Sequence, residues 1–230
     1  MSEWWTYELS DLILFSAHTY YRLIELYNSE IWPLQIPAIL AGFAILYLSW
    51  RQPPSSNKII SILLAVSWFW VAWAFHWQRF ATIHWVASYF AIAFIVQGTI
   101  LAWAGLAKTS LTFNKYKDRQ FYVGFALLGY AILIQPLIMT IAGHNWRQGE
   151  IFGIAPDPTV VATIGLLYIT DTRKYWWLMI IPVLYCIVSA ATLWVLKSAN
   201  AAGMIIAGLL ALLSLIRPCF KNKIQPFTPE

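Results

Sequence analysis

The chain has 230 residues, of which 60% are hydrophobic and 11% are charged, and its formal net charge is +5. Its apolar residues come in runs close to the ~20 that cross the hydrocarbon of a bilayer, which predicts a polytopic membrane protein with the lipid bilayer as its surroundings. Most of the basic residues cluster in short gaps between these runs, as in cytoplasmic loops, so the positive charge indicates no nucleic-acid partner.

The N-terminal segment, MSEWWTYELSD, is acidic and lacks the basic segment of a signal peptide, so we expect it to belong to the mature protein. Residues 9–28 place apolar side chains on one face of a helix. This pattern predicts an amphipathic helix that lies on the membrane surface, with Ser10 as its N-cap. A tilted first span is the alternative, but it would bury four ionisable groups: Asp11, His18, Arg22 and Glu25.

Seven apolar runs follow Trp32 and Pro33, and each is predicted to form a helix. They cover residues 34–50, 59–76, 84–106, 121–143, 151–170, 175–196 and 201–217, and they leave 218–230 as a tail. The expected fold is all-α, a single membrane domain in which the interfacial helix precedes a bundle of about seven transmembrane helices.

The Lys and Arg residues in the gaps predict the orientation. If all seven runs cross and the N-terminus lies outside, eleven basic residues lie inside and four outside, namely Arg22, Arg79, Arg147 and Lys197. This bias follows the positive-inside rule and places the C-terminus inside. If 151–170 were a re-entrant loop, seven basic residues would lie inside and eight outside. We therefore predict that this run crosses fully, its 20 residues covering about 30 Å as a helix.

Asp157 is the carboxylate inside an otherwise apolar run, and it lies between Pro156 and Pro158. Each proline removes a backbone donor and resists continuing a preceding helix, so a break is predicted there. Two interpretations remain open. In the first interpretation, Asp157 is the N-cap of the following helix, and its side chain bonds to the amides of Thr159 or Val160, with Pro158 at the first helical position. Alternatively, it binds a ligand or transfers a proton, because a charge in hydrocarbon is costly and typical of functional sites.

Other polar or helix-breaking residues lie inside the runs. Gln97 in the third run and Gln135, followed by Pro136, in the fourth are the least expected, and Pro182 is predicted to interrupt the sixth. Glutamines in membrane bundles commonly bridge neighbouring helices and prolines kink them. The functional alternative is that these residues line a path through the bundle.

Small residues at every fourth position predict a close-packing face on the last helix: Gly203, Ala207 and Ala211. The sequence has no evident internal repeat, so it does not support a transporter built from inverted repeats.

Four histidines, His18, His76, His84 and His144, all fall at the outer face in this topology, at a depth near Asp157. Neutral imidazoles with a carboxylate could bind zinc or copper, or relay protons. The alternative is a structural role, since the spacing of His76 and His84 is no recognised ligand motif. The hypothetical metal site comprises His76, His84 and His144, and no other cofactor is predicted.

The chain has no GxSxG, HExxH, Walker or dinucleotide motif. The favoured function is a small-solute or ion transporter or channel, with an outward-facing cavity near Asp157, Gln135 and Gln97. One alternative is a membrane-embedded enzyme that uses the outer histidines and Asp157, with or without a metal. Another is a non-catalytic partner or sensor whose acidic N-terminal helix docks a second protein, and a homo-oligomer is also open.

Four segments carry a family resemblance: LFSAHTYYRLIELYNSEIWPLQ, RFATIHWVASYFAIAFIVQG, GIAPDPTVVATIGLL and WWLMIIPVLYCIVSAATLW. With these segments the chain resembles a family of bacterial integral membrane proteins known only as a domain of unknown function. The PDPT run followed by TIGLL is the most specific part. The resemblance implies a multi-helix protein of the bacterial inner membrane and carries no activity.

Overall fold

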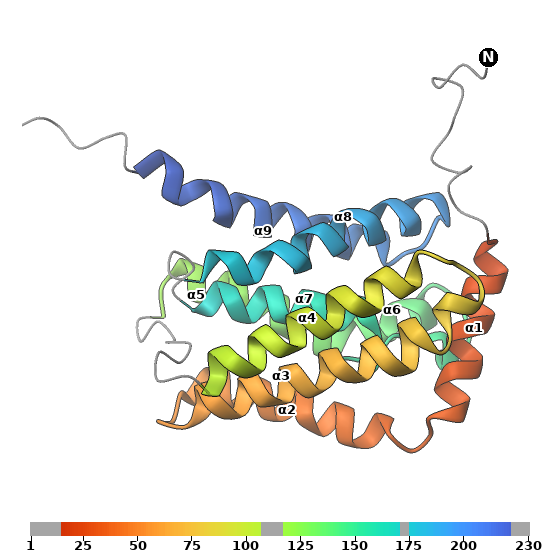
Figure 1. The fold of residues 1–230 in the computed structure, drawn as a ribbon, viewed down its shortest axis with the longest axis horizontal. Helices are drawn as coiled ribbons and strands as arrows, with labels where there is room; N and C mark the ends of the chain where they lie inside the picture. Colours follow the sequence, from red (N-terminus) through yellow and green to blue (C-terminus); the bar gives the residue numbers. More distant parts are fainter. Residues whose placement is uncertain (1–14, 107–116, 171–174, 222–230) are drawn as a thin grey trace, which may run out of the picture.

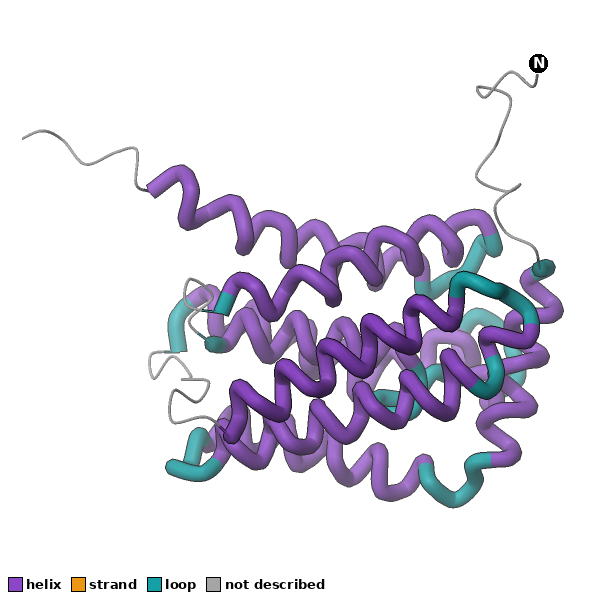
Figure 2. Tube along the Cα trace, viewed as in Figure 1, coloured by secondary structure: helices purple, strands orange, loops and turns teal. Residues whose placement is uncertain are grey.

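The computed structural model describes residues 15–106, 117–170 and 175–221, with only the backbone described beyond Leu215. These residues form helices joined by short loops (Figure 2). The elements in chain order are α1 (Ala17–Glu30), α2 (Gln35–Arg51), α3 (Ser56–Trp70), the π-helical η3 (Val71–Trp77), the short η4 (Phe80–Thr82), α4 (Ala87–Leu106), α5 (Arg119–Gly129), the π-helical η5 (Tyr130–Ile134), α6 (Gln135–Ile141), the short η6 (Trp146–Gln148), α7 (Pro156–Ile169), the short η7 (Trp176–Met179), α8 (Ile180–Val195) and α9 (Ala201–Lys221).

The long helices lie side by side and alternate in direction along the molecule (Figure 1). The closest neighbours are α3 with α4, α5 with α7, and α8 with α9. Helix α1 lies across one end of this bundle, at 95° to α2 (Figure 1). We call this end, which also holds the loops before α4, α7 and α9, the α1 end. Each of the seven predicted runs contains a helix, and the all-α fold class is confirmed.

In the part of the chain that the structure describes, four helical stretches are long and apolar enough to cross a membrane: Ser56–Thr82, Ala87–Leu106, Arg119–Ile141 and Trp176–Val195. The bent pair of α1 and α2 adds a fifth if it is counted as one span. Large apolar side chains on the outside of these helices are exposed, as expected of surfaces that face hydrocarbon: Phe43 on α2, Ile92 and Ile95 on α4, and Leu184 and Ile187 on α8.

Helix α7 is the centre of the bundle, because every residue from Pro156 to Ile169 is buried. It has 14 residues and is therefore about 21 Å long, shorter than the 30 Å predicted for the run 151–170. The difference lies at the start of that run, where residues 151–155 form a loop. Pro156 begins the helix, since a missing N–H costs nothing in the first turn. The predicted break beside the prolines is confirmed, and the helix is shorter than the predicted 30 Å because it does not include residues 151–155.

Glycines let α5 approach the backbone of α7. A Cβ atom on Gly165 would lie 2.7 Å from the carbonyl oxygen of Gly124 and 2.8 Å from the amide nitrogen of Leu128. Side-chain atoms cannot occupy such distances, so the contact requires glycine at both positions. The predicted small face of α9 is also packed, with Ala207 and Ala211 fully buried.

Helix α1 differs from its prediction at its start and in what its apolar face contacts. It begins at Ala17 with Ser16 as the N-cap, whose hydroxyl accepts from the Thr19 amide at 3.2 Å. Ser10, the predicted N-cap, lies outside the described residues. The buried face packs on the protein and not on lipid: Tyr20, Tyr21, Ile24 and Tyr27.

Two further predictions, on Pro182 and on the C-terminal tail, are corrected. Pro182 does not interrupt a helix, because it is the third residue of α8, where a proline is tolerated. Pro136 follows the π-helical η5, whose wider turn accommodates the missing N–H at the start of α6. The predicted tail 218–230 begins within α9, which continues to Lys221, and the remainder lies outside the described residues.

Candidate functional site

Asp157 bonds to a neighbouring helix and does not cap its own. The N-cap of α7 is Ala155, and Asp157 is the second helical residue, 1% exposed. Its Oδ1 accepts hydrogen bonds from the Ser189 hydroxyl at 2.8 Å and the Tyr185 hydroxyl at 3.2 Å, both on α8. Its Oδ2 has no hydrogen-bond partner. The N-cap interpretation is therefore wrong, although a negative charge still suits the N-terminal turn of a helix.

Glu150 is a second buried carboxylate, close to the first. Its Oε1 accepts from the Tyr20 hydroxyl at 3.2 Å, and its Oε2 accepts from the Asn200 amide at 3.3 Å. Burial raises the pKa of Glu150, the Asp157 charge raises it further, and hydrogen bonds that include one from Gln135 act in the opposite direction. The two carboxylates therefore interact electrostatically.

Sequence analysis missed Glu150, because this residue lies one position before the run 151–170, in a gap expected at the surface. A usable signal existed. The chain has only 10 acidic residues, and Glu150 and Asp157 are separated by a single apolar, proline-containing stretch. Both acids flank the non-helical segment that the prolines predict.

Side chains satisfy the backbone of the loop before α7. Thr159 accepts from the Gly153 amide at 2.9 Å and donates to the Ala155 carbonyl at 2.7 Å. Tyr27 on α1 donates to the Ile154 carbonyl at 2.9 Å. Gly153 has a φ of 82°, in the left-handed region that favours glycine. These bonds pair backbone polar groups that the buried loop would otherwise leave without a partner.

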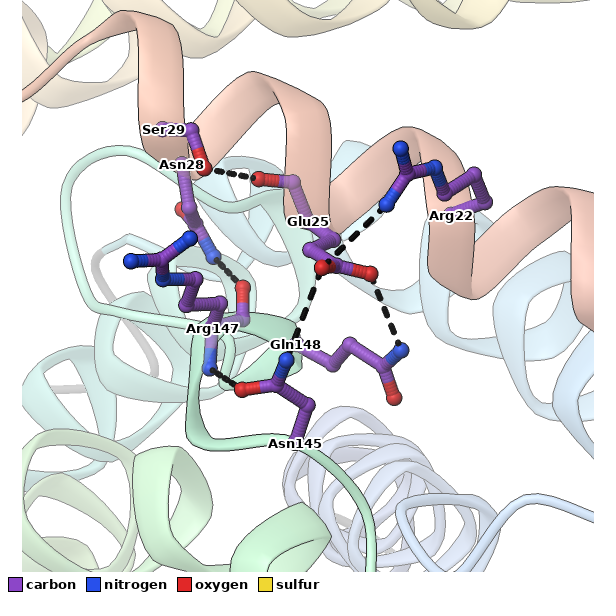
Figure 3. A network of polar contacts seen from close by, with 7 residues as sticks. All are labelled: Arg22, Glu25, Asn28, Ser29, Asn145, Arg147 and Gln148. Carbon is purple, nitrogen blue, oxygen red and sulfur yellow. Dashed lines mark hydrogen bonds and ion pairs between the residues drawn. The ribbon is translucent and has the colours of Figure 1, made fainter.

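Polar side chains fasten α1 to the loop that follows α6 (Figure 3). The Glu25 carboxylate forms an ion pair with Arg22 on the same helix, at 3.2 Å. It also accepts from the side-chain amides of Asn145 and Gln148, each at 3.5 Å. Glu25 is predicted from the sequence to lie on the polar face of a surface helix, and its side chain instead bonds to the loop that follows α6.

Asn28 makes the second attachment between α1 and this loop (Figure 3). Its amide donates to the backbone carbonyls of Arg147 at 2.7 Å and Gly149 at 3.0 Å. These contacts hold the chain directly before Glu150. Helix α1 therefore covers the buried carboxylates and fixes the position of one of them.

A pocket of about 530 Å³ opens between α1, α4 and α8, beside the two carboxylates. Its polar wall includes the hydroxyl-bearing residues that bind the acids, Tyr20, Tyr185 and Ser189. The rest of its lining is mainly aromatic and aliphatic, including Phe15, Phe80, Trp85 and Phe90. A ligand in this pocket would contact the same residues whose hydroxyls hold Asp157 and Glu150.

The structure brings together only some of the predicted site residues. Gln135 lies at Glu150 and thus in the same cluster as Asp157. Gln97 does not join them, because its amide donates to the Leu178 carbonyl at 3.0 Å and bridges α4 to η7. Leu178 precedes Tyr185 by about two helical turns. The bridging interpretation of Gln97 is confirmed.

The three histidines of the hypothetical metal site lie in different surroundings. His76 is buried among aromatic rings, 4.6 Å from the ring of Phe94 between centroids. His84 lines the pocket and stacks on Phe80, and burial lowers its pKa. His144 is exposed beside Tyr21. Among the described residues, no three His, Cys, Asp or Glu side chains are grouped so that they could hold a metal ion.

Comparison with known proteins places the chain in a family. The model of the "Family of unknown function (DUF6064)" matches residues 17–226. The chain belongs to this family. The DUF6064 match extends over every described helix, including the loop with Glu150 and Asp157, and it confirms the predicted resemblance to a family without a known activity. Neither a curated protein nor a solved structure matches the chain.

Proposed function

We propose that this DUF6064 protein transports a small solute across a membrane, and that the solute binds in the pocket between α1, α4 and α8. The observation that carries this proposal is the polar wall of the pocket, where Tyr185 and Ser189 both donate to the buried Asp157. Ionisable groups inside a membrane bundle are costly and usually mark a solute or ion path. An apolar pocket with a few convergent polar groups is the usual form of a small-molecule site.

The lining of the pocket favours a solute with an apolar body and a cationic or hydrogen-bond-donating group. Aromatic faces such as those of Trp85 and Phe90 attract a cation, and the carboxylate behind Tyr185 adds a negative potential. Among the described residues, no ion pair neutralises Asp157 or Glu150. The proposed solute is therefore a lipophilic amine or a related organic cation.

We further propose that α2, α3 with η3, α4, α5 with α6, α7, α8 and α9 each cross the bilayer, with the α1 end outside and the C-terminus inside. Their alternating directions support this arrangement. The short α7 is compatible with it, because α7 and most of the preceding loop are enclosed by protein, where non-helical backbone is tolerated at membrane depth. The eleven-to-four distribution of basic residues favours this orientation.

The topology is tested with single cysteines in a variant that lacks Cys186 and Cys219. Cysteines at positions 112, 172 and 223 are expected to react with a membrane-impermeant maleimide only from the cytoplasmic side. The exposed residues Trp146 and Ala199 at the α1 end supply the outer controls, and cysteines there are expected to react only from outside. Labelling of position 172 or 223 from outside would contradict the seven-span arrangement.

Filling the pocket tests the binding site. Ala191→Trp places an indole in the pocket that Ala191 lines, and Leu184→Trp places the same group on α8 at a 58% exposed position that does not line it. We expect Ala191→Trp to weaken binding of radiolabelled tetraphenylphosphonium by at least about tenfold, or 1.4 kcal/mol, and Leu184→Trp to leave it unchanged. Equal binding by both variants would place the solute elsewhere.

A further inference from the structure

Three buried oxygen atoms near the carboxylate pair have no hydrogen-bond partner: Asp157 Oδ2, Gln135 Oε1 and Asn200 Oδ1. Each belongs to a side chain that is 1% exposed. Gln135 and Asn200 both bond to Glu150 with their amides, so their carbonyl oxygens lie in the same cluster. Buried polar atoms without a partner are rare, and an ion or an ordered water commonly accounts for them.

All three atoms are acceptors, and their chemistry points to a cation. Carboxylate and carbonyl oxygens are the ligands of hard cations. Each oxygen of Glu150 already accepts a hydrogen bond, from Tyr20 and from Asn200, and Oδ1 of Asp157 accepts two. One carboxylate oxygen and two neutral carbonyl oxygens are therefore free, a set that suits a single positive charge.

Charge balance supports the same conclusion. An unpaired buried carboxylate is expensive to desolvate, and a partner of opposite charge offsets much of this cost. Within the described ranges, the ion pairs join Arg22 to Glu25 and Arg79 to Glu30, and neither involves Asp157 or Glu150. A bound cation supplies the missing countercharge.

We propose that a sodium ion binds between Asp157, Gln135 and Asn200, beside Glu150. The site lies at the start of α7 and directly after the π-helical η5, at the α1 end of the bundle. Tyr185 and Ser189 lie between this site and the aromatic pocket, so the two sites are separate. Sodium binding here does not depend on the identity of any transported solute.

Thermal unfolding of the full chain in detergent tests the proposal. Sodium chloride replaces N-methylglucamine chloride at constant pH and ionic strength, and the melting temperature is measured across the series. N-methylglucamine is a strongly hydrophilic cation, whereas a quaternary ammonium such as choline could itself bind in the aromatic pocket. A ligand that binds only the folded state raises this temperature in a saturable manner. We expect such a rise with sodium. The same titration with calcium chloride tests whether a divalent ion raises the melting temperature instead.

Two glutamine variants provide a matched comparison. Gln135→Leu removes a proposed sodium ligand, and Gln97→Leu removes an equally buried glutamine that bonds Leu178 at another place in the bundle. Both variants are expected to melt below wild type in N-methylglucamine. Only Gln97→Leu is expected to keep the sodium-dependent rise, whereas Gln135→Leu loses it.

Three outcomes would overturn the proposal. The first is a wild-type melting temperature that is the same in sodium and in N-methylglucamine, in which case a proton shared by the two carboxylates would offset their charge. The second is a rise with calcium and not with sodium. The third is a sodium response that survives in Gln135→Leu. Binding of tetraphenylphosphonium is measured separately, so failure of the sodium site and failure of the proposed transport function are distinguished.

Discussion

Gly165→Leu is expected to prevent the bundle from assembling. The Cβ atom alone would meet the Gly124 carbonyl oxygen at 2.7 Å and the Leu128 amide nitrogen at 2.8 Å, and backbone atoms of α5 cannot move aside without separating the helices. Leucine has a better helix propensity than glycine, so a loss of stability would come from packing and not from α7 itself. We expect a destabilisation of more than about 3 kcal/mol, because α7 is buried on all sides.

The matched control is Gly129→Leu in α5, where a Cβ atom would have no neighbour within 4 Å. This variant is expected to fold like wild type, with a small gain from helix propensity of up to about 1 kcal/mol. Gel filtration in detergent and thermal unfolding measure both variants. A monodisperse Gly165→Leu protein with wild-type stability would contradict the close approach of α5 and α7.

Asp157→Asn is expected to abolish binding of both sodium and the organic cation while leaving the fold intact. The asparagine Oδ1 still accepts from Ser189 and Tyr185, so the link between α7 and α8 is kept. The negative charge is lost, and an N–H donor replaces the free Oδ2. Removing a buried charge relieves its desolvation cost, so the melting temperature in N-methylglucamine is expected to equal or exceed that of wild type. Sodium-dependent stabilisation and tetraphenylphosphonium binding are both expected to disappear.

Asp157→Ala separates the structural contribution of the side chain from its charge. Alanine leaves the hydroxyls of Ser189 and Tyr185 without their acceptor, which costs about 1–3 kcal/mol. We expect this variant to lose both binding and stability, in contrast to Asp157→Asn. Should the asparagine protein bind sodium and the organic cation like wild type, the charge of Asp157 would have no role, and the carboxylate would serve only to join α7 to α8.

The features that sequence analysis predicted correctly depend on local chemistry. Apolar runs predict helices because a backbone surrounded by hydrocarbon must bond to itself, and each of the seven runs contains a helix. The break beside Asp157 follows from the fixed φ and missing N–H of Pro156 and Pro158, and α7 begins at the first of them. These constraints act within a few residues, so a single sequence contains them.

The two glutamines show where local reasoning ends. Gln97 and Gln135 each lie within an apolar run, and both become 1% exposed. Gln97 bonds the backbone at Leu178, whereas Gln135 bonds Glu150 and leaves its carbonyl oxygen free. Which neighbour each amide meets depends on how the helices pack, and the same local pattern therefore leads to a helix bridge in one place and to a candidate ligand in the other.

By itself, the sequence determined the helical fold class, the positions of the apolar helices and the interruption before α7. The tertiary structure alone decided the candidate site, which joins Tyr20 to Glu150, 130 positions later, and Glu150 to Asn200, another 50 positions on. Helix periodicity and residue propensity describe neighbours within a turn or two, whereas these hydrogen bonds form only after α1 crosses the end of the bundle and the α6–α7 loop folds beneath it. For this reason Asp157 could be singled out from the sequence, and its partners could not.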